Sequence, residues 1–329
     1  MKKSEWVGPG VLAVGGLIAG LVLAGGSGVL ALVLPWLCIN ALLAMSLRQM
    51  MLVGEVSLAI GAFYGIGAYT AAQLTLLAQT PLIVSVLVGS LVAALSAAII
   101  GSVTLKVSGA TFILVSFAFT EALRLVYTRT DWLGGNSGLI GIFADQGTTV
   151  TFMVCATVGV GLLLFALERS RLGRQFEVVE DKPLLASVSG ISPWSTKMIA
   201  MTISGAVAGL SGGLFAHYSS VIAPTDFSYM ISITTLAFVM IGGRRYLLGV
   251  VIGAFVLTFI TEEMRAFGTY EPLVYGSALI VAMVLMPQGI AGVAVAAFRR
   301  LTGMARGSFE PPDDTDGDVP ATELAGAPR

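Results

Sequence analysis

Charged residues are scarce in this sequence. Lys, Arg, Asp and Glu together make up 11% of its 329 residues, whereas about a quarter of an ordinary soluble domain is charged. So few charges cannot cover the surface of a globule of this size. The formal net charge is −1, so a nucleic-acid partner has no electrostatic support. These shortages argue against a soluble domain and favour a membrane protein.

Side chains for catalysis or metal binding are also few. His217 is the single histidine, which rules out the H-E-x-x-H zinc motif, and no lysine follows a glycine, which rules out a P-loop ATPase site. Ser27 in the Gly25–Gly28 run could serve a hydrolase together with His217, but Gly and Ser are expected in a short turn anyway. Cys38 and Cys155 lie inside apolar runs. They are expected to be small hydrophobes, with no disulfide and no metal.

Long apolar runs are the main feature that is present. Hydrophobic residues make up 56% of the chain, and a helix needs about 20 apolar residues to cross a bilayer. Because backbone amides in lipid must be bonded within their own segment, each run is predicted to be helical. The sequence therefore predicts an all-α polytopic membrane protein with about ten transmembrane helices: 7–25, 28–46, 56–78, 82–104, 110–128, 150–168, 197–216, 229–242, 246–262 and 272–290.

The distribution of Lys and Arg predicts the orientation. If the N-terminus is cytoplasmic and ten helices cross, every Lys and Arg except Arg124, Arg129 and Arg265 lies in a cytoplasmic segment, as the positive-inside rule requires. Both termini are then cytoplasmic. Residues 1–300 form the transmembrane domain, with a long cytoplasmic loop at 169–196. The tail 301–329 is acidic and poor in apolar residues, so it is expected to be disordered.

Small residues recur at helix-packing spacing. Gly205, Gly209 and Gly213 repeat every four residues, and Gly61 with Gly65 does the same. Such faces let helix backbones approach closely in a membrane, where lipid offers no hydrophobic driving force between helices. Packing within the chain is the expected use, and a subunit interface is the alternative.

Ionisable residues inside apolar runs are costly and are therefore candidates for function. Glu121 lies three residues before Arg124, so the two share a helix face. Two interpretations stay open for this pair: a local ion pair that lowers the cost of both charges, or a role in a solute path. Glu55 opens the span 56–78, where an interfacial position is the simplest interpretation.

The loop 169–196 contains the signals of a short helix. Pro183 suits a first helical turn and Asp181 complements its positive end, while Gly190 suits the position just past the helix end. Its apolar members are Leu184, Leu185 and Val188. Such a helix either lies on the lipid surface or docks into a groove of a cytoplasmic partner.

Several stretches resemble one family. Residues 54–70, GEVSLAIGAFYGIGAYT, are similar to the G-x-[VL]-S-L-x-x-G-A-F-x-G-x-G-A-Y signature of branched-chain amino acid ABC permeases. Residues 119–124 resemble that family's F-x-E-x-x-R stretch, and residues 134–139 its external glycine-rich loop. Residues 223–228 and 242–249 follow in the same order. The resemblance runs from about residue 40 to residue 292 and is greatest to the LivM-type subunit.

The resemblance implies a set of partners and a location. It implies a second permease subunit of the same family in a heterodimer, two cytoplasmic ATPase subunits that bind ATP and Mg, and a periplasmic or lipid-anchored solute-binding protein. The chain itself would hold no cofactor and no catalytic residue. It would be a multi-pass protein of the prokaryotic plasma (inner) membrane, in contact with membrane lipid and not with nucleic acid.

The resemblance also implies roles for particular residues. The helix 183–190 would be the coupling helix that docks on an ATPase, with Leu184 and Leu185 replacing the Glu and first Ala of the family's E-A-A-x-x-x-G loop. Arg244 and Arg245 depart from the small residues usual after Gly242-Gly243, and both lipid phosphate and the ATPase are open as their contacts. The coupling residues would be Asp181, Pro183, Leu184, Leu185, Ala186 and Gly190.

A solute path is expected along the third predicted span and the Glu121 pair. Hydroxyl groups there would meet a passing zwitterion, and glycines would let the helix bend. The expected solutes are branched-chain amino acids or related small polar molecules: other amino acids, amides, urea or small carboxylates. An ion-coupled secondary transporter that uses Glu121 is the alternative; a membrane enzyme and an assembly protein are weaker ones. The path candidates are Ser57, Gly61, Tyr64, Gly65, Tyr69, Thr70, Glu121 and Arg124, and the external loop candidates are Gly134, Gly135 and Asn136.

Overall fold

The structure is a computed structural model that describes residues 29–142, 145–264 and 276. The predicted span 7–25, the Gly25–Gly28 run, nearly all of the predicted span 272–290 and the tail 301–329 lie outside the described residues. The chain divides into two units, residues 1–293 and 294–329. All the described residues belong to the first unit.

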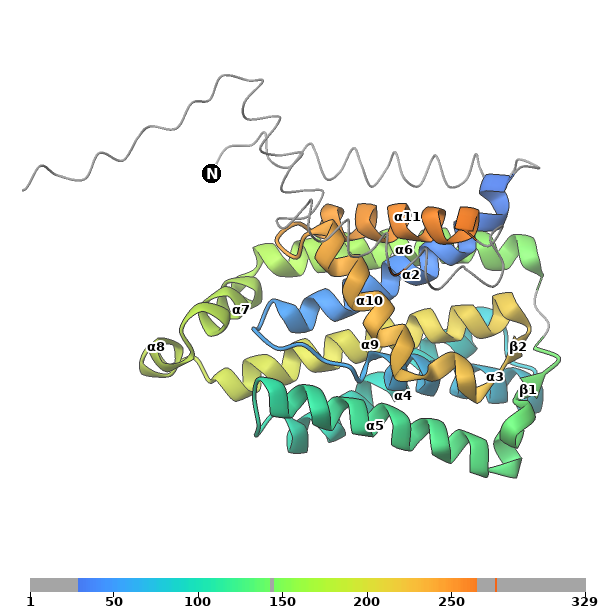
Figure 1. The fold of residues 1–329 in the computed structure, drawn as a ribbon, viewed down its shortest axis with the longest axis horizontal. Helices are drawn as coiled ribbons and strands as arrows, with labels where there is room; N and C mark the ends of the chain where they lie inside the picture. Colours follow the sequence, from blue (N-terminus) through green and yellow to red (C-terminus); the bar gives the residue numbers. More distant parts are fainter. Residues whose placement is uncertain (1–28, 143–144, 265–275, 277–329) are drawn as a thin grey trace, which may run out of the picture. The chain divides into compact units, whose positions relative to one another are not determined.

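The described residues form a mainly helical fold, as the apolar runs predict (Figure 1). The α-helices are α2 (Val29–Met51), α3 (Ile60–Ala78), α4 (Leu82–Thr104), α5 (Ala110–Arg129), α6 (Gln146–Arg169), α7 (Arg171–Asp181), α8 (Pro183–Val188), α9 (Pro193–Ser219), α10 (Tyr229–Gly242) and α11 (Leu247–Met264). Short 3-10 helices are η2 (Asp131–Leu133), η3 (Gly135–Ser137) and η4 (Pro224–Phe227), and the strands are β1 (Leu139–Ile140) and β2 (Val221–Ile222).

The number of spans is smaller among the described residues than the apolar runs suggest. Six helices are long and apolar enough to cross a membrane, namely α2, α3, α4, α5, α6 and α9. α10 and α11 qualify only as a pair, bent by 119° at the break between them. α10 has 14 residues and is roughly 21 Å long, short of the ~30 Å hydrocarbon core. The described helices thus give six or up to seven spans, and the count of ten is not confirmed.

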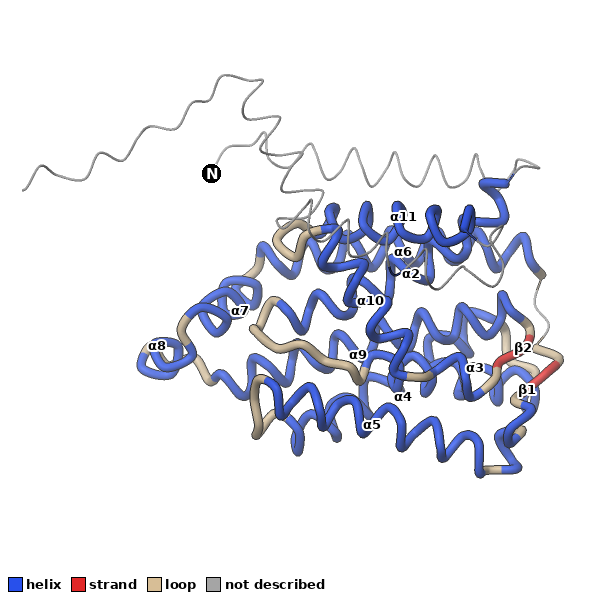
Figure 2. Tube along the Cα trace, in the orientation of Figure 1, coloured by secondary structure: helices blue, strands red, loops and turns tan. Residues whose placement is uncertain are grey.

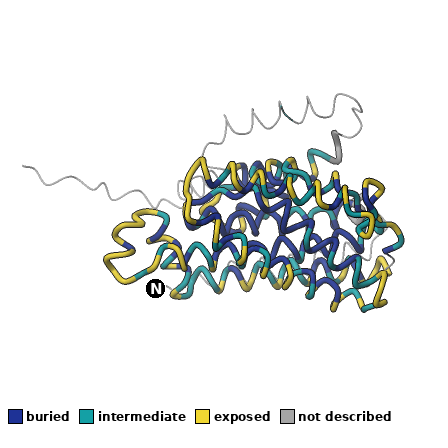
Figure 3. The backbone as a smooth tube through the Cα atoms, turned by 90° about the horizontal axis from the view of Figure 1, so that it is seen from below, coloured by how far each residue is buried: buried dark blue, intermediate teal, exposed yellow. Residues whose placement is uncertain are grey.

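The outer helices turn apolar side chains outward. Leu91 on α4, Leu114 on α5 and Leu163 on α6 are 69%, 67% and 64% exposed. Figure 3 shows the buried residues gathered in the interior of the bundle, with exposed residues around it. Apolar surface of this extent is unfavourable in water and suits a lipid environment.

The glycine face of α9 packs within the chain. A Cβ added at Gly205 or Gly209 would collide with Ala97 or Ala93 of α4, and one added at Gly213 would meet Val86 Cα at 3.2 Å. Close backbone approach of this kind holds membrane helices together. Packing within the chain, the expected use of this spacing, is confirmed for α4 and α9.

The bundle has two distinct ends. α7 and α8 extend from one end, and β1 and β2 lie at the opposite end (Figure 1). β1 pairs antiparallel with β2, with Leu139 opposite Ile222. This two-stranded sheet joins the loop after α5 to the loop after α9, two stretches that the charge distribution assigns to the same face of the membrane. We refer below to the α7–α8 end and the β1–β2 end.

α3 starts later than the sequence predicts. Its first residue is Ile60, and residues 52–59 are not helical. Figure 2 shows this loop running from the α7–α8 end toward the middle of the bundle. Glu55 within it is buried, with Lys197 Nζ at 2.6 Å from Oε1 and the Gly109 N–H donating to Oε2 at 3.3 Å. Its carboxylate is therefore paired inside the protein and is not solvated at an interface.

Candidate functional site

The loop before α3 reaches deep into the bundle. Leu58 lies beside α5: its N–H donates to Ser116 Oγ at 3.0 Å, and its carbonyl accepts from Thr120 Oγ1 at 2.8 Å. Ser116 is six residues into α5, which is roughly 9 Å along the axis at 1.5 Å per residue. Non-helical backbone at such a depth is tolerated only where protein buries it or where it lines a cavity. Side-chain hydroxyls of α5 supply the bonds that a helix would otherwise supply.

The start of α10 lies at the same depth from the other side. Its Ser232 Oγ donates to the Leu58 carbonyl at 2.8 Å and accepts from the Gly61 N–H at 2.9 Å. The Tyr229 N–H donates to Glu121 Oε1 at 3.2 Å, roughly 16 Å along α5 from its start. α3 and α10 therefore begin side by side near the middle of α5 and run toward opposite ends. We call this meeting of residues 57–61, 227–232 and 116–121 the mid-bundle junction.

Broken helices that start in mid-membrane are characteristic of transporter binding sites. The N-terminal end of a helix carries a partial positive charge and free N–H groups, and in many transporters such ends face an anionic group of the substrate. Here Ser232 and Glu121 occupy one N–H of each helix start. The junction thus combines two helix starts, several hydroxyl groups and a carboxylate in one place.

Glu121 makes two contacts at the junction. Besides the Tyr229 N–H, its Oε2 accepts from Arg124 Nε at 2.7 Å. The ion pair that the sequence suggests is therefore present, with side chains 20% and 32% exposed. The same carboxylate also holds the N-terminus of α10, which sequence spacing does not reveal. A role of this pair in a solute path stays a prediction.

An aromatic cluster lies between the junction and the β1–β2 end. Tyr69 stacks on Tyr127 of α5 with ring centroids 4.2 Å apart, and Phe227 of η4 packs against both. The Tyr64 ring centroid lies 5.3 Å from that of Phe227 and 5.5 Å from that of Phe215. The hydroxyls of Tyr69 and Tyr127 are buried and have no hydrogen-bond partner among the described residues.

The other path candidates have structural contacts. Ser57 Oγ accepts the Ala59 N–H at 3.2 Å, just before α3 begins. A Cβ at Gly61 would meet Ser228 O at 3.0 Å, and one at Gly65 would meet Tyr127 Cε2 at 3.0 Å. Thr70 is only partly buried. Gly61 and Gly65 of α3 thus serve close packing against α10, η4 and α5, whereas Ser57 bonds the backbone just before α3.

The predicted external loop is a compact turn at the β1–β2 end. Gly134 and Gly135 have positive φ angles of 83° and 54°, which glycine adopts without strain. Asn136 lies in η3, which leads into β1. Since β1 pairs with β2, this loop is fixed to the segment that precedes η4.

A short helix lies where the sequence predicts the coupling helix. Pro183 is the first residue of α8, and Gly190 follows the helix end with a φ of 78°. Leu184, Leu185 and Val188 are 83%, 54% and 86% exposed, whereas Ala186 is buried. Asp181 ends α7, a helix that the sequence analysis missed.

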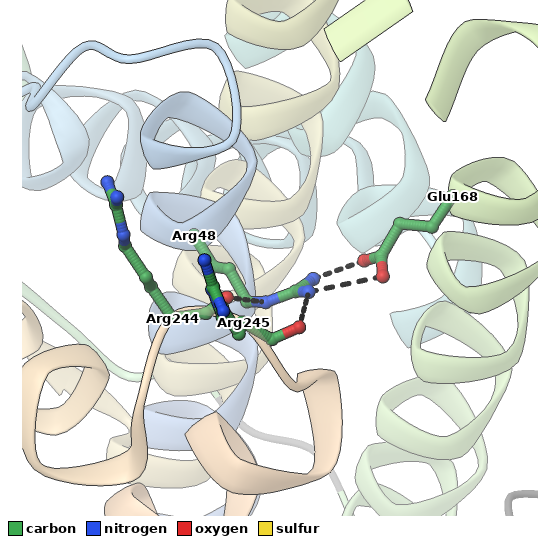
Figure 4. Close-up of polar contacts among 4 residues, drawn as sticks. All are labelled: Arg48, Glu168, Arg244 and Arg245. Carbon is green, nitrogen blue, oxygen red and sulfur yellow. Dashed lines mark hydrogen bonds and ion pairs between the residues drawn. The ribbon is translucent and has the colours of Figure 1, made fainter. Parts of the chain in front are cut away.

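Two ion pairs lie close together beside α7. Arg48 of α2 is buried and bonds the Glu168 carboxylate at the end of α6, and Figure 4 shows it also reaching the backbone carbonyls of Arg244 and Arg245. The Arg244 side chain pairs with Glu180 of α7 at 2.9 Å. One of the two unusual arginines therefore has a partner within the chain.

Several residues of the junction and of the aromatic cluster were not predicted from the sequence. Ser116, Thr120 and Tyr127 are spaced by four and seven residues on one face of α5 and are buried. A polar stripe at helical spacing inside an apolar run could have identified this face. Ser232 and Phe227 gave no such signal, because their partners lie far away in the sequence. Among residues 29–142 and 145–264, no group of three or more His, Cys, Asp and Glu could hold a metal ion.

The sequence is similar to known membrane-transport proteins. The sequence profile of the family described as "Branched-chain amino acid transport system / permease component" matches residues 29–286. The high-affinity branched-chain amino acid transport system permease protein LivM of Salmonella typhimurium is 28% identical over 287 residues, which cover 77% of this chain and 68% of that protein.

More distant relatives broaden the comparison. The probable branched-chain amino acid transport permease protein LivH of Methanocaldococcus jannaschii is 31% identical over 162 residues, 46% of this chain and 50% of that protein. The fructose import permease protein FrcC of Rhizobium meliloti is 24% identical over 301 residues, 84% of each chain. No solved structure matches. Because the family profile spans well over half of the sequence, including α3, α5 and α10, this chain belongs to the branched-chain amino acid transport system permease family.

Proposed function

We propose that this chain is one permease subunit of an ATP-binding-cassette importer and that it translocates branched-chain amino acids or closely related small polar solutes. The observation that carries the proposal is the mid-bundle junction of a member of a permease family: the starts of α3 and α10 meet at Ser232, and Glu121 of α5 binds the first N–H of α10. A site near the middle of the membrane, built from broken helices, is what alternating access needs.

The Glu121–Arg124 pair suits the head group of an amino acid. A zwitterion carries one anion and one cation, and the pair offers a guanidinium and a carboxylate 2.7 Å apart. Exchange of the internal ion pair for two ion pairs with the solute would cost little electrostatic energy, because every charge keeps a partner. The aromatic cluster of Tyr69, Tyr127 and Phe227 then closes the path toward the β1–β2 end, and the two unpartnered hydroxyls would meet the solute when it opens.

The energy would come from partner subunits. α8 offers exposed Leu184 and Val188 beyond the bundle, which suits docking into a groove of a cytoplasmic ATPase. ATP-driven closure of two ATPase subunits would then move α8 as a rigid body. A second permease subunit of the same family and a solute-binding protein would complete the importer in the prokaryotic plasma membrane.

Reconstitution tests this proposal. The chain is placed in proteoliposomes with its permease partner, the ATPase subunits and the binding protein, and uptake of leucine, fructose and urea is compared. Leucine uptake that requires ATP and the binding protein is expected. Accumulation by this chain alone under an H⁺ or Na⁺ gradient would contradict the proposal and favour the ion-coupled alternative. Uptake of fructose in place of leucine would keep the importer but overturn the solute, since FrcC is a fructose import permease.

A further inference from the structure

A buried arginine joins three segments at the α7–α8 end. Arg48 lies one turn before the end of α2, and its side chain is 1% exposed. Its Nη2 donates to Glu168 Oε2 at 3.1 Å and its Nη1 bonds the other carboxylate oxygen. Its Nε donates to the Arg244 carbonyl at 2.8 Å and Nη2 to the Arg245 carbonyl at 3.3 Å (Figure 4). The planar guanidinium thus holds the end of α6 and the α10–α11 bend in one fixed arrangement.

The end of α6, where Glu168 bonds Arg48, is joined rigidly to α7. Ser170 separates the two helices, accepting the Leu172 N–H at 3.1 Å and donating to the Leu167 carbonyl at 2.6 Å. Gly173 packs directly on the backbone of Glu168, with no room for a Cβ. We call residues 167–173 the α6–α7 elbow. Because the elbow is bonded and closely packed, a displacement of α7 is carried to Glu168.

A second link joins the bend to α7 itself. The Arg244 side chain points away from Arg48 in Figure 4 and pairs with Glu180 Oε1 at 2.9 Å. Arg245 is exposed, and among the described residues its side chain makes no ion pair. The two adjacent arginines therefore differ: both carbonyls bind Arg48, but only Arg244 also binds α7 through its side chain.

α10 connects this bend to the mid-bundle junction. It has no Pro, and its one Gly is the last residue, Gly242, so it is expected to move as a rod of roughly 21 Å. Its far end is Tyr229, whose N–H binds Glu121. A displacement of the α10–α11 bend is therefore expected to displace the start of α10 at the junction as well.

We propose that Arg48 and the Arg244–Glu180 pair fasten the α10–α11 bend to the α6–α7 elbow, so that movement of α7 and α8 shifts the start of α10 at Glu121. This inference rests on the proposed function, since it takes α8 to be moved by an ATPase. It makes Arg48, Glu180 and Arg244 positioning residues that transmit motion without touching the solute.

The test uses the half-exposed Arg244–Glu180 pair, because a change at buried Arg48 can prevent folding. Arg244→Glu, Glu180→Arg and the double charge swap are each made in the complete reconstituted importer, and Arg245→Glu is the matched control. ATP hydrolysis and solute uptake are measured on the same vesicles. Each single variant is expected to raise the ATP hydrolysed per solute by about threefold, since half-exposed pairs interact weakly. The double swap restores the wild-type ratio, and Arg245→Glu leaves it unchanged.

A role in assembly alone gives a different result. It lowers uptake and hydrolysis in proportion, so that the ratio stays constant in all four variants, and this outcome overturns the inference. Hydrogen exchange at the amides of residues 229–232 separates the inference from the proposed function. ATP is expected to change exchange there in the wild type and not in Arg244→Glu. If ATP changes exchange in the wild type and not in Arg244→Glu, but the wild type takes up none of the tested solutes, the proposed function is wrong and the fastening of the bend to the elbow is supported. If ATP does not change exchange in the wild type, the fastening is overturned.

Discussion

The carboxylate of Glu121 binds the backbone N–H of Tyr229, a residue 108 positions later in the chain, at 3.2 Å. This bond fixes the start of α10 against the middle of α5. It gives a charge inside an apolar helix two simultaneous roles, because the same side chain holds Arg124. A half-buried carboxylate is best tolerated where both of its oxygens have donors.

Replacing Glu121 by Gln is expected to lower uptake efficiency about tenfold, because hydrogen bonds to a charged group contribute roughly 1.5–3 kcal/mol. Initial uptake rates across solute concentrations in proteoliposomes would measure this. Arg124→Gln and the double variant complete a double-mutant cycle. If the two charges act as one unit, the double variant loses little more than either single one. Fully additive losses would contradict a shared role.

Gly61 is expected to tolerate no larger residue. An added Cβ would meet Ile231 Cγ2 at 2.9 Å and Ser228 O at 3.0 Å, so Gly61→Leu must push α10 away from α3. Uptake is expected to fall more than about tenfold, since overpacking costs roughly 1–3 kcal/mol or more. Gly159→Leu on α6 is the matched control, because nothing lies within 4 Å of a Cβ there. Unchanged uptake in Gly61→Leu would refute close approach at the junction as a requirement.

The sequence predicted those elements whose signals are local. The apolar runs give the helices, and Pro183 with Gly190 gives both ends of α8, because helix caps depend on the adjacent backbone. α7 was missed because its face of Phe176 and Val179 is embedded among charges, and a stretch of low mean hydropathy resembles a loop.

The junction could not be predicted in the same way. A hydropathy average over about 20 residues does not resolve the short non-helical stretch 52–59. The hydrogen bonds that satisfy the Leu58 backbone come from Ser116 and Ser232, which are 58 and 174 positions away in the sequence. No local pattern encodes such partners. The motif at 54–70 marked this segment through family resemblance, but the contacts that explain it appear only in three dimensions.

The hydroxyls of Tyr69 and Tyr127 are predicted to serve transport and not stability. Both are buried without a hydrogen-bond partner among the described residues, and a buried hydroxyl that lacks a partner costs roughly 1–3 kcal/mol. Tyr127→Phe is therefore expected to leave the melting temperature unchanged or to raise it, while the KM for uptake increases severalfold. Tyr246→Phe, at an exposed site in the α10–α11 turn, is the control and should change neither. A fall in melting temperature with unchanged KM would show a purely structural role.

The exposed apolar face of α8 is predicted to bind the ATPase. Leu184 and Val188 are more than four-fifths exposed, so Leu184→Asp with Val188→Asp should change the stability of the chain by less than about 1 kcal/mol. Copurification of the ATPase subunits is expected to fall more than tenfold, because burial of two such side chains contributes roughly 1.5–3 kcal/mol each. Val221→Asp at the opposite end is the control, since it replaces an exposed apolar residue far from α8 (Figure 1). If α8 instead lies on lipid, the double variant retains the ATPase, and only a cysteine introduced at Ser187 gains accessibility to aqueous thiol reagents. That result would contradict a role of α8 in coupling to the ATPase.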